Sequence, residues 1–209
     1  ALVMTAISLL IPILCVSRFQ LVFAVLLAAF TYISLQKLFH PGWLFGLFVV
    51  MIPFYLILTV ARSHNIEYLN GIFEMKNASM PIFVSQPYIY IANNYDNFNF
   101  LVGALPGHSF GLKGLFPLWA LSGLKFFFPQ LINFPIYVDK TELTTLTLFY
   151  DSYYDFGWIG VLIFSCILGA IAYILVVKLR EMRNPLGYLL YAQLAAYLML
   201  SFFTTWFSN

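Results

Sequence analysis

The feature that most constrains this chain is a series of apolar runs, each close to the length that crosses a lipid bilayer. An α-helix rises about 1.5 Å per residue, so roughly 20 apolar residues cross the hydrocarbon core. The five predicted spans cover residues 1–17, 19–36, 43–61, 157–177 and 186–207. Because lipid offers the backbone no hydrogen-bond partners, we expect all five spans to be helices.

The composition agrees with a membrane protein. Only 9% of the residues are charged and 62% are hydrophobic, whereas a soluble domain carries about 25% charged residues. We therefore expect an all-α fold, a polytopic transmembrane helical bundle that forms one membrane domain over residues 1–209. The sequence begins and ends beside apolar runs, and we expect it to be a segment of a longer protein. A net charge of +2, scattered along the chain, argues against a nucleic-acid partner.

The basic residues near the span ends predict the orientation of the chain in the membrane. Residues 178–183 hold three cations and one acid, which is typical of a cytoplasmic loop. Two predicted spans separate this loop from Lys37, so the loop that holds Lys37 is expected on the same side of the membrane. Residues 62–156 then form an outer segment with twelve of the 18 charged residues. Its two apolar pieces, 81–103 and 112–128, are interrupted by proline and polar residues, and we expect them to be interfacial or re-entrant helices.

Two spacings in the outer segment predict local structure. Asp139, Lys140, Thr141 and Glu142 follow the pattern of a helix capping box. This pattern predicts a helix that begins there and leads toward the fourth span. Asp151 and Asp155 are four residues apart and would share one face of a helix.

Three stretches of the outer segment carry a family resemblance. They are NNYDNFNFLV at 93–102, SFGLKGLFPLWALSGLKFFFP at 109–129 and TTLTLFYDSYYDFGWIGVLIFSCILGA at 144–170. Their order resembles the bacterial oligosaccharide repeat unit polymerases, the Wzy-type O-antigen and capsular polysaccharide polymerases. In that family a threonine-bearing segment leads into Asp-Phe-Gly-x-x-Gly at the start of a membrane helix, and here that motif runs from Asp155 to Gly160.

The resemblance implies a multi-pass glycosyltransferase of the bacterial cytoplasmic (inner) membrane that acts at its outer face. It would join oligosaccharide repeat units carried on undecaprenyl diphosphate, in the synthesis of O-antigen, capsule or exopolysaccharide. The growing chain would leave its lipid diphosphate and pass to a sugar hydroxyl of the incoming unit. The implied partners are the lipid-linked oligosaccharide, membrane lipids, and chain-length regulator and flippase proteins.

Such a transfer needs cations beside the leaving diphosphate, a base for the acceptor hydroxyl, and polar and aromatic groups for the sugars. The candidates are Arg62, Lys113 and Lys140 for the diphosphate, Glu142, Asp151, Asp155 and His64 for the base, and Tyr90, Asn94, Tyr95 and Asp96 for the sugars. The acidic and basic candidates can also have purely structural roles. An acid can complement the dipole of a helix N-terminus, and an arginine beside a span can bind the phosphate of any membrane lipid. The sequence does not choose among the bases.

Neither a metal nor an organic cofactor is predicted, since the acids lack the close spacing of a ligand set. Three other functions compete with the polymerase. One is a structural membrane subunit, in which small residues such as Gly157 and Gly160 would only pack helices. An O-antigen ligase would use the same donor and a different acceptor. A transporter or flippase of lipid-linked oligosaccharides would place polar residues at mid-membrane. The concentration of polar residues in the outer segment favours chemistry at the surface.

Overall fold

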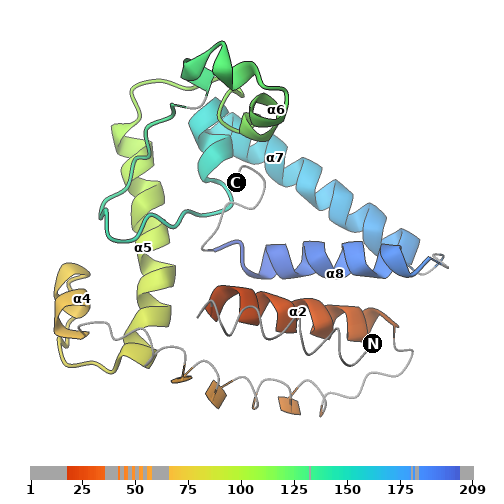
Figure 1. The fold of residues 1–209 in the computed structure, drawn as a ribbon, viewed down its shortest axis with the longest axis horizontal. Helices are drawn as coiled ribbons and strands as arrows, with labels where there is room; N and C mark the ends of the chain where they lie inside the picture. The colour runs from red at the N-terminus through yellow and green to blue at the C-terminus, as the bar shows by residue number, and fades with distance from the viewer. Residues whose placement is uncertain are drawn as a thin grey trace. The chain divides into compact units, whose positions relative to one another are not determined.

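The structure is a computed structural model that describes residues 18–35, 66–131, 133–179, 181 and 184–202, with single positions between 42 and 57. Within these residues all regular secondary structure is helical and no strand occurs, as the all-α prediction requires (Figure 1). In chain order the helices are α2 (Arg18–Leu35), α4 (Ile66–Ile72), α5 (Ile82–Ala104), α6 (Phe116–Leu121), η1 (Leu124–Phe126), η2 (Pro129–Leu131), α7 (Tyr150–Leu179) and α8 (Pro185–Met199).

The chain divides into two compact units. The first unit combines Ala1–Gln86 with Ile174–Leu198. In it α2 and α8 lie side by side (Figure 1), and the rings of Phe23 and Tyr197 stack with their centroids 5.4 Å apart. The buried Asn70 amide closes the loop after α4 by donating to the carbonyls of two residues further along the chain.

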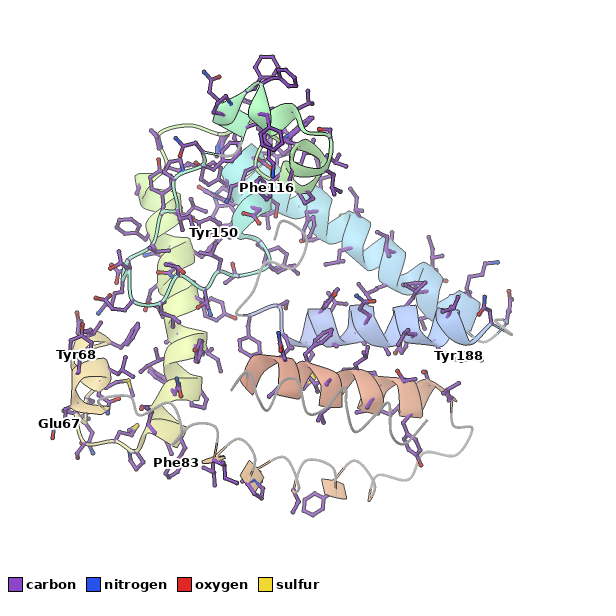
Figure 2. All side chains as sticks on the ribbon, viewed as in Figure 1. Glu67, Tyr68, Phe83, Phe116, Tyr150 and Tyr188 are labelled. Carbon is purple, nitrogen blue, oxygen red and sulfur yellow. The ribbon has the colours of Figure 1, made fainter. Side chains whose placement is uncertain are left out.

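The second unit combines Pro87–Tyr173 with Met199–Asn209 and contains most of the predicted outer segment. Its core joins Leu101 of α5 to three tyrosines at the start of α7, Tyr150, Tyr153 and Tyr154. Figure 2 shows Tyr150 among closely grouped side chains at this place. The Tyr150 hydroxyl accepts a hydrogen bond from the Tyr137 N–H and donates one to the Tyr137 carbonyl, both at 2.8 Å. A buried phenol is stable there because its hydroxyl is satisfied.

Helix α5 differs from the interrupted piece predicted for residues 81–103. It runs without a break for 23 residues, although it contains Pro87 and a cluster of asparagines. Three of these asparagines, Asn93, Asn94 and Asn97, are accommodated because they are buried and donate to backbone carbonyls. Asn93 and Asn97 lie four residues apart on one face and donate to the carbonyl of Leu143, while Asn97 also donates to that of Thr145.

The predicted capping box at residues 139–142 is wrong. No helix begins there, and residues 133–149 form an extended loop with turns that follows α5 (Figure 1). The asparagine amides of α5 bind the loop carbonyls that a helix would have used, and Asn97 Oδ1 also accepts the N–H of Asp139 at 3.0 Å. Threonines with low helix propensity occupy much of the second half of the loop.

Helix α7 begins at Tyr150, seven residues before the predicted start of the fourth span. It consists of two helical parts that meet at Gly157, whose φ of 63° and ψ of −148° are not helical. Only glycine adopts such angles readily. A carbon added to Gly160 would overlap the carbonyl oxygen of Ser152, so the turn before the kink lies directly against the second part of the helix.

One helix in the described part of the chain is long and apolar enough to cross a membrane. It comprises the 29 residues Tyr150–Lys178, and an 18-residue window within it has a mean hydropathy of 2.7. Large apolar side chains of this helix, such as Ile159 and Leu162, are mostly exposed.

The other predicted spans have different outcomes. Helices α2 and α8 match two of them in position, but their apolar stretches, Val22–Leu35 and Leu186–Met199, are shorter. The span predicted to end at residue 207 leaves its helix at Met199, since residues 200–202 form a turn. The span at 1–17 and most of the span at 43–61 lie outside the described residues.

Candidate functional site

The candidate site lies where the turn after α5 meets the first turns of α7. We call it the Lys113 cluster and define it as Ser109, Lys113, Asp151, Asp155 and the rings of Tyr150 and Tyr154. All of its members belong to the second unit. The segment that carries Lys113 lies over the start of α7 (Figure 1).

Lys113 is nearly enclosed and has three neighbours of complementary character. Its Nζ lies 3.3 Å from Asp151 Oδ1, and the two side chains are only 14% and 11% exposed. The same Nζ lies 5.8 Å from the ring centroid of Tyr150 and 5.2 Å from that of Tyr154. A cation over an aromatic face is attracted because the quadrupole of the ring makes that face electrostatically negative. The ammonium is therefore held between a carboxylate and two π-faces.

Asp155 is bound differently, although it shares a helix face with Asp151 as predicted. Its Oδ1 accepts hydrogen bonds from the Ser109 hydroxyl and from the Lys113 N–H at 3.1 Å. Its Oδ2 accepts the N–H of Gly114 at 2.7 Å. The side chain is buried, with 3% of the residue exposed. Three hydrogen-bond donors therefore converge on this one buried carboxylate.

Main-chain contacts reinforce this junction. The N–H groups of Ser109 and Phe110 donate to the carbonyls of Tyr154 and Asp155, at 3.2 and 3.0 Å. These carbonyls belong to the turn before Gly157, where the kink interrupts the helical hydrogen-bond ladder, so they need donors from elsewhere.

The predicted diphosphate and base residues are placed as follows. The contacts join Lys113, Asp151 and Asp155 in one cluster. Lys140 and Glu142 lie in the 133–149 loop, Lys140 half-buried and Glu142 exposed. The remaining two candidates, Arg62 and His64, lie outside the described residues.

The predicted sugar-binding residues all lie on α5, where they face in different directions. Asn94 is completely buried, and its amide donates to the carbonyl of Tyr90, whose side chain is half-buried. Tyr95 and Asp96 are exposed. Of the four predicted residues, Tyr95 and Asp96 are therefore the most accessible to a sugar and Asn94 is inaccessible.

Three members of the Lys113 cluster, Ser109, Tyr150 and Tyr154, were not among the sequence candidates, and neither was Gly114, whose N–H binds the Asp155 carboxylate. Gly114 is needed because a carbon added to it would lie 2.7 Å from Asp155 Oδ2. Its partner is 41 residues away in sequence, and no local pattern indicates such a pairing. The two tyrosines flank Asp151 within the quoted threonine-to-glycine stretch, and their helical spacing places them on one face.

The described residues contain no group of three or more histidine, cysteine, aspartate or glutamate side chains that could hold a metal ion. Comparison with known proteins found no matching family model, and neither the curated proteins nor the solved structures gave a significant match. The chemistry of the site must therefore be inferred from its geometry.

Proposed function

We propose that this chain belongs to a membrane glycosyltransferase that polymerises undecaprenyl-diphosphate-linked oligosaccharide repeat units at the outer face of the bacterial cytoplasmic membrane. In this proposal the helices form a polytopic bundle. Lys113 binds the diphosphate of the donor, and Asp151 is the general base for the acceptor hydroxyl. Exposed residues of α5, such as Tyr95 and Asp96, contact the sugars.

The observation that carries the proposal is the position of Asp151 near the start of α7, where its carboxylate pairs with Lys113. About 20 helical residues cross a hydrocarbon core of roughly 30 Å, and residues 158–177 provide that length. The turn from Tyr150 to Phe156 then falls at the level of the lipid headgroups. A lipid-linked diphosphate lies at the same depth. Lys178 and the basic residues after it favour a cytoplasmic position for the opposite end.

The paired charges also suit the reaction. A cation beside the leaving diphosphate stabilises the negative charge that develops on it. A carboxylate beside the acceptor hydroxyl removes its proton as the new glycosidic bond forms. The substrate diphosphate competes with Asp151 for the ammonium of Lys113, and its binding leaves the carboxylate to act as the base.

The test compares variants of the full chain in membranes supplied with lipid-linked oligosaccharides extracted from the same cells. Asp151→Asn is expected to lower polymer formation by about 10²- to 10⁴-fold, the usual range for loss of acid–base catalysis. Lys113→Ala is expected to lower it by about 10²- to 10³-fold, the usual range for loss of one group that stabilises transition-state charge. The matched controls are Lys125→Ala, which removes a lysine that lies over the ring of Phe126, and Asp139→Asn, which changes an exposed acid. Both controls are expected to retain activity.

The distribution of glycans in intact cells separates this proposal from its competitors. For Lys113→Ala the polymerase proposal predicts single repeat units at the outer face and no long chains. Accumulation of single units at the cytoplasmic face would overturn the proposal in favour of a transporter. Long chains that remain on their lipid carrier would overturn it in favour of a ligase.

A further inference from the structure

Both carboxylate oxygens of Asp155 accept hydrogen bonds from the protein itself, although this residue lies close to the proposed base. Oδ1 is used by the Ser109 hydroxyl and the Lys113 N–H, and Oδ2 by the N–H of Gly114. A general base must lie within hydrogen-bond reach of the proton that it removes. The buried carboxylate of Asp155 instead binds three donors of the protein itself. Its role must therefore pass through the turn that it holds.

The turn from Ser109 to Gly114 is fixed to α7 at both of its ends, and the Asp155 carboxylate takes part at each end because it also accepts the Ser109 hydroxyl. At the first end, the N–H groups of Ser109 and Phe110 bind main-chain carbonyls before the kink. At the second end, the N–H groups of Lys113 and Gly114 bind the Asp155 side chain. Loss of the carboxylate would release the second end, whereas the first end would lose only the bond of the Ser109 hydroxyl and would keep its two main-chain hydrogen bonds.

The second end is the one that determines where the ammonium of Lys113 points. The backbone N–H of Lys113 is bound to Asp155, while its Nζ reaches Asp151, one helical turn earlier on the same face. The absence of a side chain at Gly114 lets the carboxylate approach the backbone this closely. The pairing of the Lys113 ammonium with Asp151 therefore depends on Asp155, which binds the backbone of Lys113 and not its ammonium.

We propose that Asp155 is a positioning residue whose carboxylate fixes the Lys113 end of the Ser109–Gly114 turn, so that the Lys113 ammonium meets Asp151. This inference rests on the proposed function only in giving Lys113 and Asp151 their roles in transfer. It assigns the Asp155-Phe156-Gly157 sequence to the construction of the junction and removes Asp155 from the set of candidate bases.

The first experiment measures hydrogen exchange in the full chain in detergent. In Asp155→Asn the amide keeps one acceptor oxygen and turns an N–H toward one of the donors. Exchange at the N–H groups of Lys113 and Gly114 is expected to accelerate by about 10- to 100-fold, as loss of a hydrogen bond to a charged group implies. The N–H of Phe110, bound to a main-chain carbonyl, is expected to keep its protection. Unchanged exchange at Lys113 and Gly114 would overturn the proposal.

A second variant keeps the proposal testable if Asp155→Asn does not fold. Ser109→Ala removes one donor and leaves the carboxylate in place. It is expected to accelerate exchange at the Lys113 N–H less strongly than Asp155→Asn does. The matched control is Ser122→Ala, whose hydroxyl donates within α6 and its C-terminal turn. Equal exchange in the two serine variants would contradict the inference.

Transfer kinetics provide a readout that a purely structural role would not move. Asp155→Asn is expected to lower the rate without changing the shape of the pH–rate profile, because the base is still present. In a Lys113→Ala background the same change is expected to have no further effect, since it acts through that lysine. A lost ionisation in the profile, or full additivity, would overturn the inference. Normal transfer by Lys113→Ala alone would refute the proposed function and leave the exchange result as a separate test of the turn.

Discussion

Gly160→Ala tests the kinked start of α7 with the smallest possible change. A methyl group at this position would overlap the carbonyl oxygen of Ser152 and lie 2.8 Å from the Cβ of Phe156. Ordinary van der Waals separations are about 3.5–4.0 Å, so the backbone of the preceding turn must move by about 1 Å or more. Overpacking of this kind costs about 1–3 kcal/mol.

The matched control is Gly169→Ala on the same helix, because nothing lies within 4 Å of the added carbon there. In a helix, alanine is more favourable than glycine by about 1 kcal/mol. Gly169→Ala is therefore expected to leave the protein equally or more stable, while Gly160→Ala lowers its stability.

The assay is thermal unfolding of both variants in the same detergent, followed by tryptophan fluorescence. For a domain of this size, about 1 kcal/mol corresponds to 2–4 °C in Tm, so Gly160→Ala is expected to unfold about 2–12 °C below the unmodified chain. The reasoning is refuted if Gly160→Ala unfolds at or above the temperature of Gly169→Ala. Such a result would mean that the turn before Gly157 does not lie against the rest of α7.

Two further predictions concern the core and the orientation of the chain. Tyr150→Phe removes the hydroxyl that satisfies both the N–H and the carbonyl of Tyr137, and it is expected to destabilise the protein by about 1–3 kcal/mol. Tyr173→Phe, which alters an exposed ring, is the control in the same thermal assay. Equal Tm values for the two variants would contradict the role of the Tyr150 hydroxyl. The orientation is tested with Asp139→Cys and Glu181→Cys, each in a chain whose two native cysteines are replaced by serine. A membrane-impermeant maleimide is expected to label Asp139→Cys from outside the cell and Glu181→Cys only after permeabilisation. Labelling of both from the same side would contradict the proposed topology.

The helical class and the positions of α2, α7 and α8 follow from the sequence because long apolar runs leave the backbone few alternatives. The continuity of α5 does not. In the sequence alone its asparagines predict an interruption of the helix, because the loop carbonyls that they bind lie about fifty residues further along the chain. One local signal was available: Asn93 and Asn97 are four residues apart and so share a helix face.

The candidate site was partly predictable for the same reason. Asp151 and Asp155 were paired correctly on one face, because helical spacing is a local property. Their different environments were not predictable, since Lys113, Ser109 and Gly114 reach them from a distant turn. The misread capping box is the converse case. The local pattern at Asp139 favours a helix start, but the N–H of Asp139 instead binds Asn97 of α5, some forty residues earlier, and no helix forms there.

The contacts of Asp155 also order the events of synthesis. Its donors precede it by 41 to 46 residues, and a ribosome delivers the chain from its N-terminus. Ser109, Lys113 and Gly114 therefore emerge with these hydrogen-bond donors still solvated. The turn can close only after the beginning of α7 has followed it out of the exit tunnel, so the proposed catalytic centre is completed late in the biogenesis of this part of the chain.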